Sequence, residues 1–186
     1  MLQEISQTAL FHFAIIFARL GSMLIFIPGM GETYVTARAR LSLGLAVSFI
    51  FLPALRNYLP PPPADILEVV LIILGEVVVG IFIGLMMRIV MSAMHVAGMI
   101  LSYMAGMAAA TLFDPNQNTQ GSLVGSFLGL VAITIFFTSE LHHIVFAAIY
   151  DSYDLFLPGQ KTPFNDFAYF SIRTVSETFL IGFKIA

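Results

Sequence analysis

The segment from Ala64 to Phe113, ADILEVVLIILGEVVVGIFIGLMMRIVMSAMHVAGMILSYMAGMAAATLF, decides the fold class of this 186-residue chain. Its 50 positions hold only four charged residues, which are Asp65, Glu68, Glu76 and Arg88. A straight helix of that length would reach about 75 Å, whereas the hydrocarbon layer of a membrane is about 30 Å thick. We therefore predict a helix that breaks, kinks or rises beyond the membrane, with Arg88 and Gly98 as the predicted break points.

The composition of the whole chain points to the same class. Hydrophobic residues make up 59% of the sequence and charged residues 10%, the net charge is -3, and the mean hydropathy is +0.93. Soluble domains carry about 25% charged residues, so too few polar side chains are present here to cover a soluble protein of this size. We predict an integral membrane protein. With no basic patch it has no means of binding nucleic acid, and without cysteine it has no disulfide or cysteine-based site.

Further apolar stretches of helical length predict the other membrane helices. They run from Ala9 to Ile27, from Leu41 to Leu55, from Ser122 through Thr138 to Ile149, and from Phe167 to Ala186. Residues 56–65 include four consecutive prolines, which cannot be helical, so we expect a Pro-rich connector there. The predicted fold is all-α, with membrane helical hairpins forming a single domain over residues 1–186. The last apolar run has no stop signal, which indicates a chain truncated at its C-terminus.

Small residues recur at helical spacing on three segments. One segment has Gly80 and Gly84, the next has Gly98, Ser102, Gly106 and Ala110, and the third has Gly121, Gly125 and Gly129. In lipid, faces of small residues let two helix backbones approach closely. Two interpretations stay open, because these faces could pack on other helices of the same chain or on other subunits. Three such faces in a short chain favour a densely packed assembly.

Methionine is concentrated in one part of the chain. Seven of the ten methionines lie between positions 86 and 107, and Met87, Met91 and Met94 share one helix face by their spacing. Because the methionine side chain is flexible and polarizable, such a group suits a surface that repacks around variable partners. The same residues could equally fill gaps in a core.

Charged residues inside apolar segments are the remaining signal. Arg19, Glu76, Arg88 and Glu140 lie in or beside such segments, where charge is costly and usually faces a protein interior or a wet cavity. Structural pairing between helices is favoured over a proton relay. The alternative function is a proton-coupled secondary transporter of a small solute, with Glu76, Arg88 and His95 as its coupling site.

Catalytic, metal and cofactor sites are disfavoured. Glu140, His142 and His143 lack the spacing of metal ligands, and adjacent histidines point to different helix faces. No phosphate-binding or dinucleotide-binding motif is present, so we expect no cofactor. No nucleophile lies beside a base in any known catalytic pattern, so an intramembrane enzyme is a third and weaker interpretation.

Several runs, taken in order, resemble one family over nearly the whole chain. They are Arg19-Leu20-Gly21 leading to Pro28; Arg38-Ala39-Arg40-Leu41-Ser42-Leu43 leading to Pro53; Gly75-Glu76 with Gly80 and Gly84; Ala97-Gly98; Gly106 to Pro115 (GMAAATLFDP); Leu141-His142-His143; Asp151-Ser152-Tyr153; and Leu157-Pro158. This pattern resembles the flagellar biosynthetic protein FliR family, whose injectisome counterpart is the SctT export-apparatus protein. The chain departs from the family at Glu140-Leu141, where a Gly-Gly pair is common before the histidines.

The resemblance implies an all-helical, non-enzymatic, pore-forming subunit of a multi-subunit helical gate for type III protein export. It implies a place in the bacterial inner membrane, at the flagellar basal body. The implied partners are FliP-like and FliQ-like gate subunits, an FlhB-like switch protein, membrane lipid and unfolded exported polypeptides. The family's pore plug lies around the loop that matches Thr111 to Gly121 here, with residues 114–121 as the plug-like loop. The residues assigned to the plug are Phe113, Asp114, Pro115, Asn116 and Asn118. The candidates for a lumen lining or gasket are Met87, Met91, Met94, Met104 and Met107.

Overall fold

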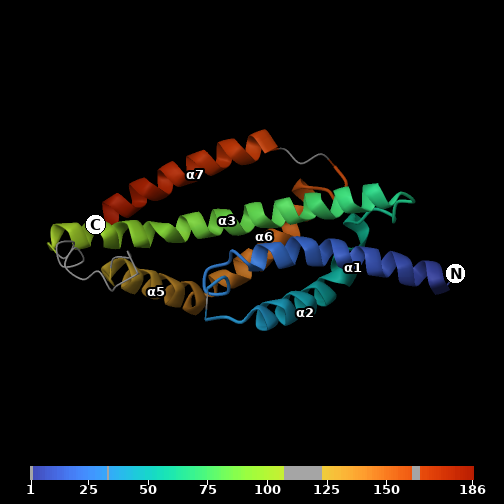
Figure 1. Ribbon diagram of the computed structural model, residues 1–186, viewed down its shortest axis with the longest axis horizontal. Helices are drawn as coiled ribbons and strands as arrows, with labels where there is room; N and C mark the ends of the chain where they lie inside the picture. The colour runs from blue at the N-terminus through green and yellow to red at the C-terminus, as the bar shows by residue number, and fades with distance from the viewer. Residues whose placement is uncertain (1, 33, 107–122, 161–163) are drawn as a thin grey trace. The chain divides into compact units, whose positions relative to one another are not determined.

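The computed structural model describes residues 2–32, 34–106, 123–160 and 164–186 (Figure 1). Its elements are α1 (Leu2–Leu24), α2 (Ala37–Leu55), the short 3₁₀ helix η1 (Arg56–Tyr58), α3 (Ile66–Met104), α5 (Leu123–Thr138), α6 (Leu141–Leu155) and α7 (Phe164–Ile185). Within these ranges the chain forms helices and no strands, which confirms the all-α prediction. The contacts divide the chain into two compact units, Met1–Leu85 with His143–Phe164 and Met86–His142 with Asn165–Ala186.

Three helical stretches are long and apolar enough to cross a membrane, namely Gln7–Leu24, Ala37–Tyr58 and Ile66–Met104. The pair α5 and α6 would add a fourth as one broken span. The chain is therefore built as a membrane-embedded protein, in agreement with its composition.

The long helix α3 continues through both predicted break points. It spans 39 residues, about 58 Å, so it is far longer than a hydrocarbon layer is thick. The prediction of breaks at Arg88 and Gly98 is wrong. A helical glycine costs only about 1 kcal/mol, and the Arg88 side chain is exposed on this chain, so neither residue forces a break.

The first unit is built around α1, whose inward side chains Ile15, Ile16, Leu20 and Met23 are fully buried. Helix α2 begins at its N-cap Thr36, whose hydroxyl oxygen accepts a hydrogen bond from the backbone nitrogen of Ala39 at 3.3 Å. After η1 the chain leaves helical geometry through the four prolines, as the sequence predicts.

The predicted continuous helix from Ser122 to Ile149 is wrong, because it breaks between α5 and α6. Glu140, in the break, has a φ of 56°, in the left-handed region that glycine adopts at little cost. A glutamate gives no sequence signal for such a turn.

In the second unit, α7 is amphipathic, and most of its large apolar side chains are exposed. Its buried positions are Phe167, Thr178 and Gly182, and a Cβ added at Gly182 would lie 2.9 Å from the carbonyl oxygen of Ala93 and from the Cβ of Val96, both on α3. The exposed side chains of α7 include Tyr169, Phe170, Ile172, Val175, Phe179, Leu180, Ile181 and Phe183. Gly182 thus lets α7 approach α3 closely, while most of the bulky apolar side chains of α7 are exposed.

Candidate functional site: a buried arginine tied to α3 and α6

The most distinctive group of polar side chains lies inside the first unit, around Arg19. This arginine projects from the buried side of α1 and is 0% exposed. Glu76 approaches it from α3 and is 3% exposed, and Ser152 and Tyr153 approach from α6 at 3% and 0%. Charged side chains are almost never this buried unless they are paired.

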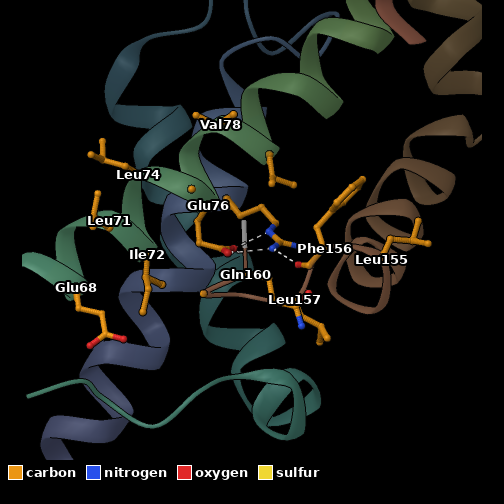
Figure 2. A pocket seen from close by; sticks show the side chains of 14 residues that line it. Glu68, Leu71, Ile72, Leu74, Glu76, Val78, Leu155, Phe156, Leu157 and Gln160 are labelled. Atoms are coloured by element: carbon orange, nitrogen blue, oxygen red, sulfur yellow. Dashed lines mark hydrogen bonds and ion pairs between the residues drawn. The ribbon is translucent and has the colours of Figure 1, made fainter. Parts of the chain in front are cut away.

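The guanidinium of Arg19 forms a two-pronged ion pair with Glu76. Its Nε donates to Glu76 Oε2 at 2.7 Å, and its Nη2 donates to Glu76 Oε1 at 3.1 Å. Its Nη1 donates to Ser152 Oγ at 2.9 Å, and Nη2 also donates to the carbonyl oxygen of Phe156 at 2.7 Å. In Figure 2 the dashed lines converge between Glu76 and Phe156. Four of the five N–H groups of the arginine are therefore used within the chain.

Tyr153 covers the guanidinium from one side. The central carbon of the Arg19 guanidinium lies 3.8 Å from the centre of the Tyr153 ring, which is a cation–π contact. The Tyr153 hydroxyl is buried and has no hydrogen-bond partner among the described residues. The ring contributes the contact with the cation, and the hydroxyl adds no bond that the structure describes.

Two glycines of α3 bring α1 close enough for this pairing. A Cβ added at Gly80, one turn after Glu76, would collide with the Arg19 carbonyl oxygen and with Ser22 Oγ. At Gly84 it would lie 2.8 Å from the Met23 carbonyl oxygen. Because these positions lack side chains, the backbones of α1 and α3 meet, and the short span that remains is bridged by Arg19 and Glu76.

A cavity of about 770 Å³ lies beside the ion pair (Figure 2). One wall comes from the start of α3, with Glu68, Leu71 and Ile72, and the other from the segment that follows α6, with Leu157 and Gln160. Arg19 and Glu76 line the cavity, yet their polar atoms are directed to each other and to α6. The hydrogen bonds of Arg19 therefore tie three helices together, α1 to α3 and to α6 with the segment after it.

Phenylalanine in place of Tyr153 should leave stability unchanged or slightly raise it. The ring and its cation–π contact are kept, and the group removed is a buried hydroxyl without a described partner. Tyr153→Leu, which removes the ring, should cost about 1–2 kcal/mol. Thermal unfolding of the purified full-length chain checks the pair. Equal destabilisation by both variants would show that the hydroxyl makes an essential bond.

The structure does not bring the predicted coupling residues together. Glu76 is engaged with Arg19, whereas Arg88 lies twelve residues further along α3, about 18 Å away along the axis. Arg88, His95 and Glu140 are exposed on this chain. Of the four charges predicted to be buried, the structure thus buries Arg19 and Glu76, and it pairs them with each other.

The predicted helix-packing glycines mostly make close contacts within the chain. Gly80 and Gly84 meet α1, while Gly98 meets the backbone of Gly125, and the imidazole of His95 would lie 2.6 Å from a Cβ at Gly129. These glycines therefore lie against the chain's own helices, and contact of the same faces with other subunits stays a prediction. Gly121 lies outside the described residues.

Gly106 has a different role from the packing predicted for it. Its φ is 69°, and no described atom lies within 4 Å of a Cβ added there. Its backbone nitrogen donates to the Tyr103 carbonyl oxygen at 3.1 Å, just past the end of α3. A glycine with positive φ in this place terminates a helix.

Four of the methionines predicted to line a lumen lie in the described part of the chain. Met87, Met91 and Met94 are half-buried on α3, and Met104 is 77% exposed at its end. The remaining lumen and plug candidates, Met107, Phe113, Asp114, Pro115, Asn116 and Asn118, lie outside the described residues.

Sequence reasoning did not single out Ser152, Tyr153 and Phe156 as site residues. The available signal was the pair Ser152-Tyr153 on a mainly apolar helix, within a motif of the resembled family. It could not identify the partner, because Arg19 lies 133 residues away from Ser152.

Comparison with known proteins gives one consistent answer. Residues 10–186 match the model of the bacterial export proteins, family 1. The chain is 32% identical to the flagellar biosynthetic protein FliR of Caulobacter vibrioides, over 93% of this chain and 69% of that protein. It is 27% identical to FliR of Bacillus subtilis, over 94% and 68%, and 25% identical to the Yop proteins translocation protein T of Yersinia pestis, over 91% and 67%.

The chain thus spans about two thirds of the length of these relatives. The match runs through α1, α3 and α6, the three helices that the Arg19 cluster joins. Because the family model covers nearly all of the sequence and the first relative is 32% identical, the chain belongs to the bacterial export proteins, family 1, the family of the FliR proteins.

Proposed function

We propose that this chain is a pore-forming subunit of the flagellar type III protein export gate, through which unfolded flagellar subunits leave the cytoplasm. The match to the export protein family over residues 10–186 is the observation that carries the proposal. The proposed location is the bacterial inner membrane at the flagellar basal body, and the proposed role is non-enzymatic.

The exposed surface of the chain supports a role within a larger assembly. Large apolar side chains are exposed on every helix longer than η1, including Phe49 on α2, Leu85 on α3, Phe127 on α5 and Phe183 on α7. Lipid can cover part of this surface and neighbouring subunits the rest. We propose that these neighbouring subunits are FliP-like and FliQ-like gate subunits and an FlhB-like switch protein.

In this proposal the loop at residues 114–121, with Phe113, closes the lumen at rest. The flexible methionines of α3 then adapt to the many polypeptides that pass. The alternative, a secondary transporter of a small solute, needs Glu76 to act with Arg88 and His95, whereas Glu76 is paired with Arg19.

Deleting residues 112–120 should make the assembled complex leak small solutes. The experiment measures efflux of a fluorescent dye from vesicles that contain the purified complex, or sensitivity of cells to a small toxic solute. A variant with the same nine positions replaced by a Gly/Ser sequence separates loss of the plug side chains from shortening of the loop. Unchanged leakage in both variants, with the complex still intact on co-purification, would remove the plug role.

A further inference from the structure

A second cavity of the first unit lies between the N-terminal half of α1 and the C-terminal end of α2. Its volume is about 550 Å³, within the range of small-molecule sites in proteins. Ala9 of α1 and Phe49, Leu52 and Pro53 of α2 form its apolar wall. Arg56, at the start of η1, is the one charged residue that lines it, and none of the described lining residues is acidic.

Arg56 is available to an outside ligand. Arg56 is exposed, and in the described part of the chain its side chain forms neither an ion pair nor a hydrogen bond. It lies near the end of the candidate span Ala37–Tyr58, two positions before the aromatic Tyr58. Arginine and tyrosine at the end of a span lie at the level of the lipid headgroups.

Pro53 leaves a backbone acceptor of α2 without its usual partner close to this cavity. Proline has no N–H, so the carbonyl oxygen of Phe49, four residues earlier, loses its helical donor. Phe49 and Pro53 both line the cavity. In a membrane an unsatisfied carbonyl is costly, and a ligand that brings a hydroxyl donor to this side of α2 would relieve the cost.

His12 holds the connector against this end of α1. The side chain is buried, and its Nε2 lies 3.0 Å from the carbonyl oxygen of Pro60. Because a carbonyl can only accept, Nε2 carries the proton of that bond. The bond ties the Pro-rich connector to α1 beside the cavity.

We propose that this cavity binds an anionic phospholipid of the surrounding membrane. The phosphate lies on Arg56, the first part of an acyl chain runs along Leu52 and Phe49, and a headgroup hydroxyl donates to the Phe49 carbonyl. An anionic phospholipid has a negative charge that complements Arg56 and an acyl chain that complements the apolar wall. A phosphatidylglycerol headgroup also carries hydroxyl groups that can donate to the Phe49 carbonyl.

The test uses the full-length chain in its membrane complex, purified in mild detergent. Phosphatidylglycerol should raise the thermal unfolding temperature and remain bound in native mass spectrometry, whereas phosphatidylcholine should do neither. Arg56→Gln should weaken phosphatidylglycerol binding about tenfold. Arg56→Lys should retain most of it, and Arg38→Gln, which removes an exposed arginine at the other end of α2, should have no effect.

A second variant separates binding from folding. The 186 residues contain no cysteine, so Leu52→Cys introduces a single thiol. This thiol should cross-link to a phosphatidylglycerol that carries a thiol-reactive acyl chain. A cross-link to a partner polypeptide instead would identify a protein occupant and overturn the proposal. Equal binding of both lipids, no change in Arg56→Gln, or the same stabilisation by inorganic phosphate alone would also overturn it.

Discussion

Replacing Arg19 by methionine should destabilise the chain by about 3–5 kcal/mol and abolish its export function. Methionine fills similar space, but it leaves the Glu76 carboxylate buried without its cation and strips a donor from Ser152 and from the Phe156 carbonyl. A loss of that size is a large part of the stability of a typical domain. Thermal unfolding of the purified protein and swimming of cells that carry the variant measure the two effects.

The control for this variant restores charge balance. In Arg19→Met with Glu76→Met, neither charge is left alone, so the double variant should recover much of the lost stability. Arg173→Met, which removes one partner of the exposed Arg173–Glu177 pair on α7, should have little effect. If the double variant were as unstable as Arg19→Met alone, the penalty would not come from an unpaired charge.

Adding a single methyl group at Gly80 should have the second largest effect. The new Cβ meets the Arg19 carbonyl oxygen and Ser22 Oγ, so α1 must move away from α3 and stretch the ion pair with Glu76. We expect Gly80→Ala to cost about 3 kcal/mol, from overpacking together with the weakened pair. Thermal unfolding and the yield of assembled complex measure the loss.

Gly21 of α1 offers a matched control for that substitution. A Cβ added there would lie 3.6 Å from the Phe17 ring, which is ordinary contact, so it fits without movement. Gly21→Ala should then stabilise its helix by about 0.5–1 kcal/mol, since alanine is the better helix former. If Gly80→Ala were as well tolerated as Gly21→Ala, the close approach of α1 and α3 would not depend on Gly80.

Local sequence patterns predicted the helices but not all of their ends. Long apolar runs predict membrane helices, and the four prolines predict a connector. Both predictions succeed because the hydropathy of a segment and the loss of helix at proline depend on residues that are adjacent in the chain. The left-handed Glu140 escaped prediction, since glutamate is not typical of that backbone conformation. The continuity of α3 also escaped it, because glycine in a helix permits a break without requiring one.

The sequence by itself determined that this chain is helical, apolar enough for a membrane and a member of one export family. Only the tertiary structure decided that Arg19 is paired with Glu76 and covered by Tyr153, and that the glycines of α3 contact the chain's own helices. The physical reason is that hydropathy and helical period are properties of adjacent residues. Burial of a charge and close approach of two backbones depend on groups that lie tens to more than a hundred residues apart, and only folding brings them into contact.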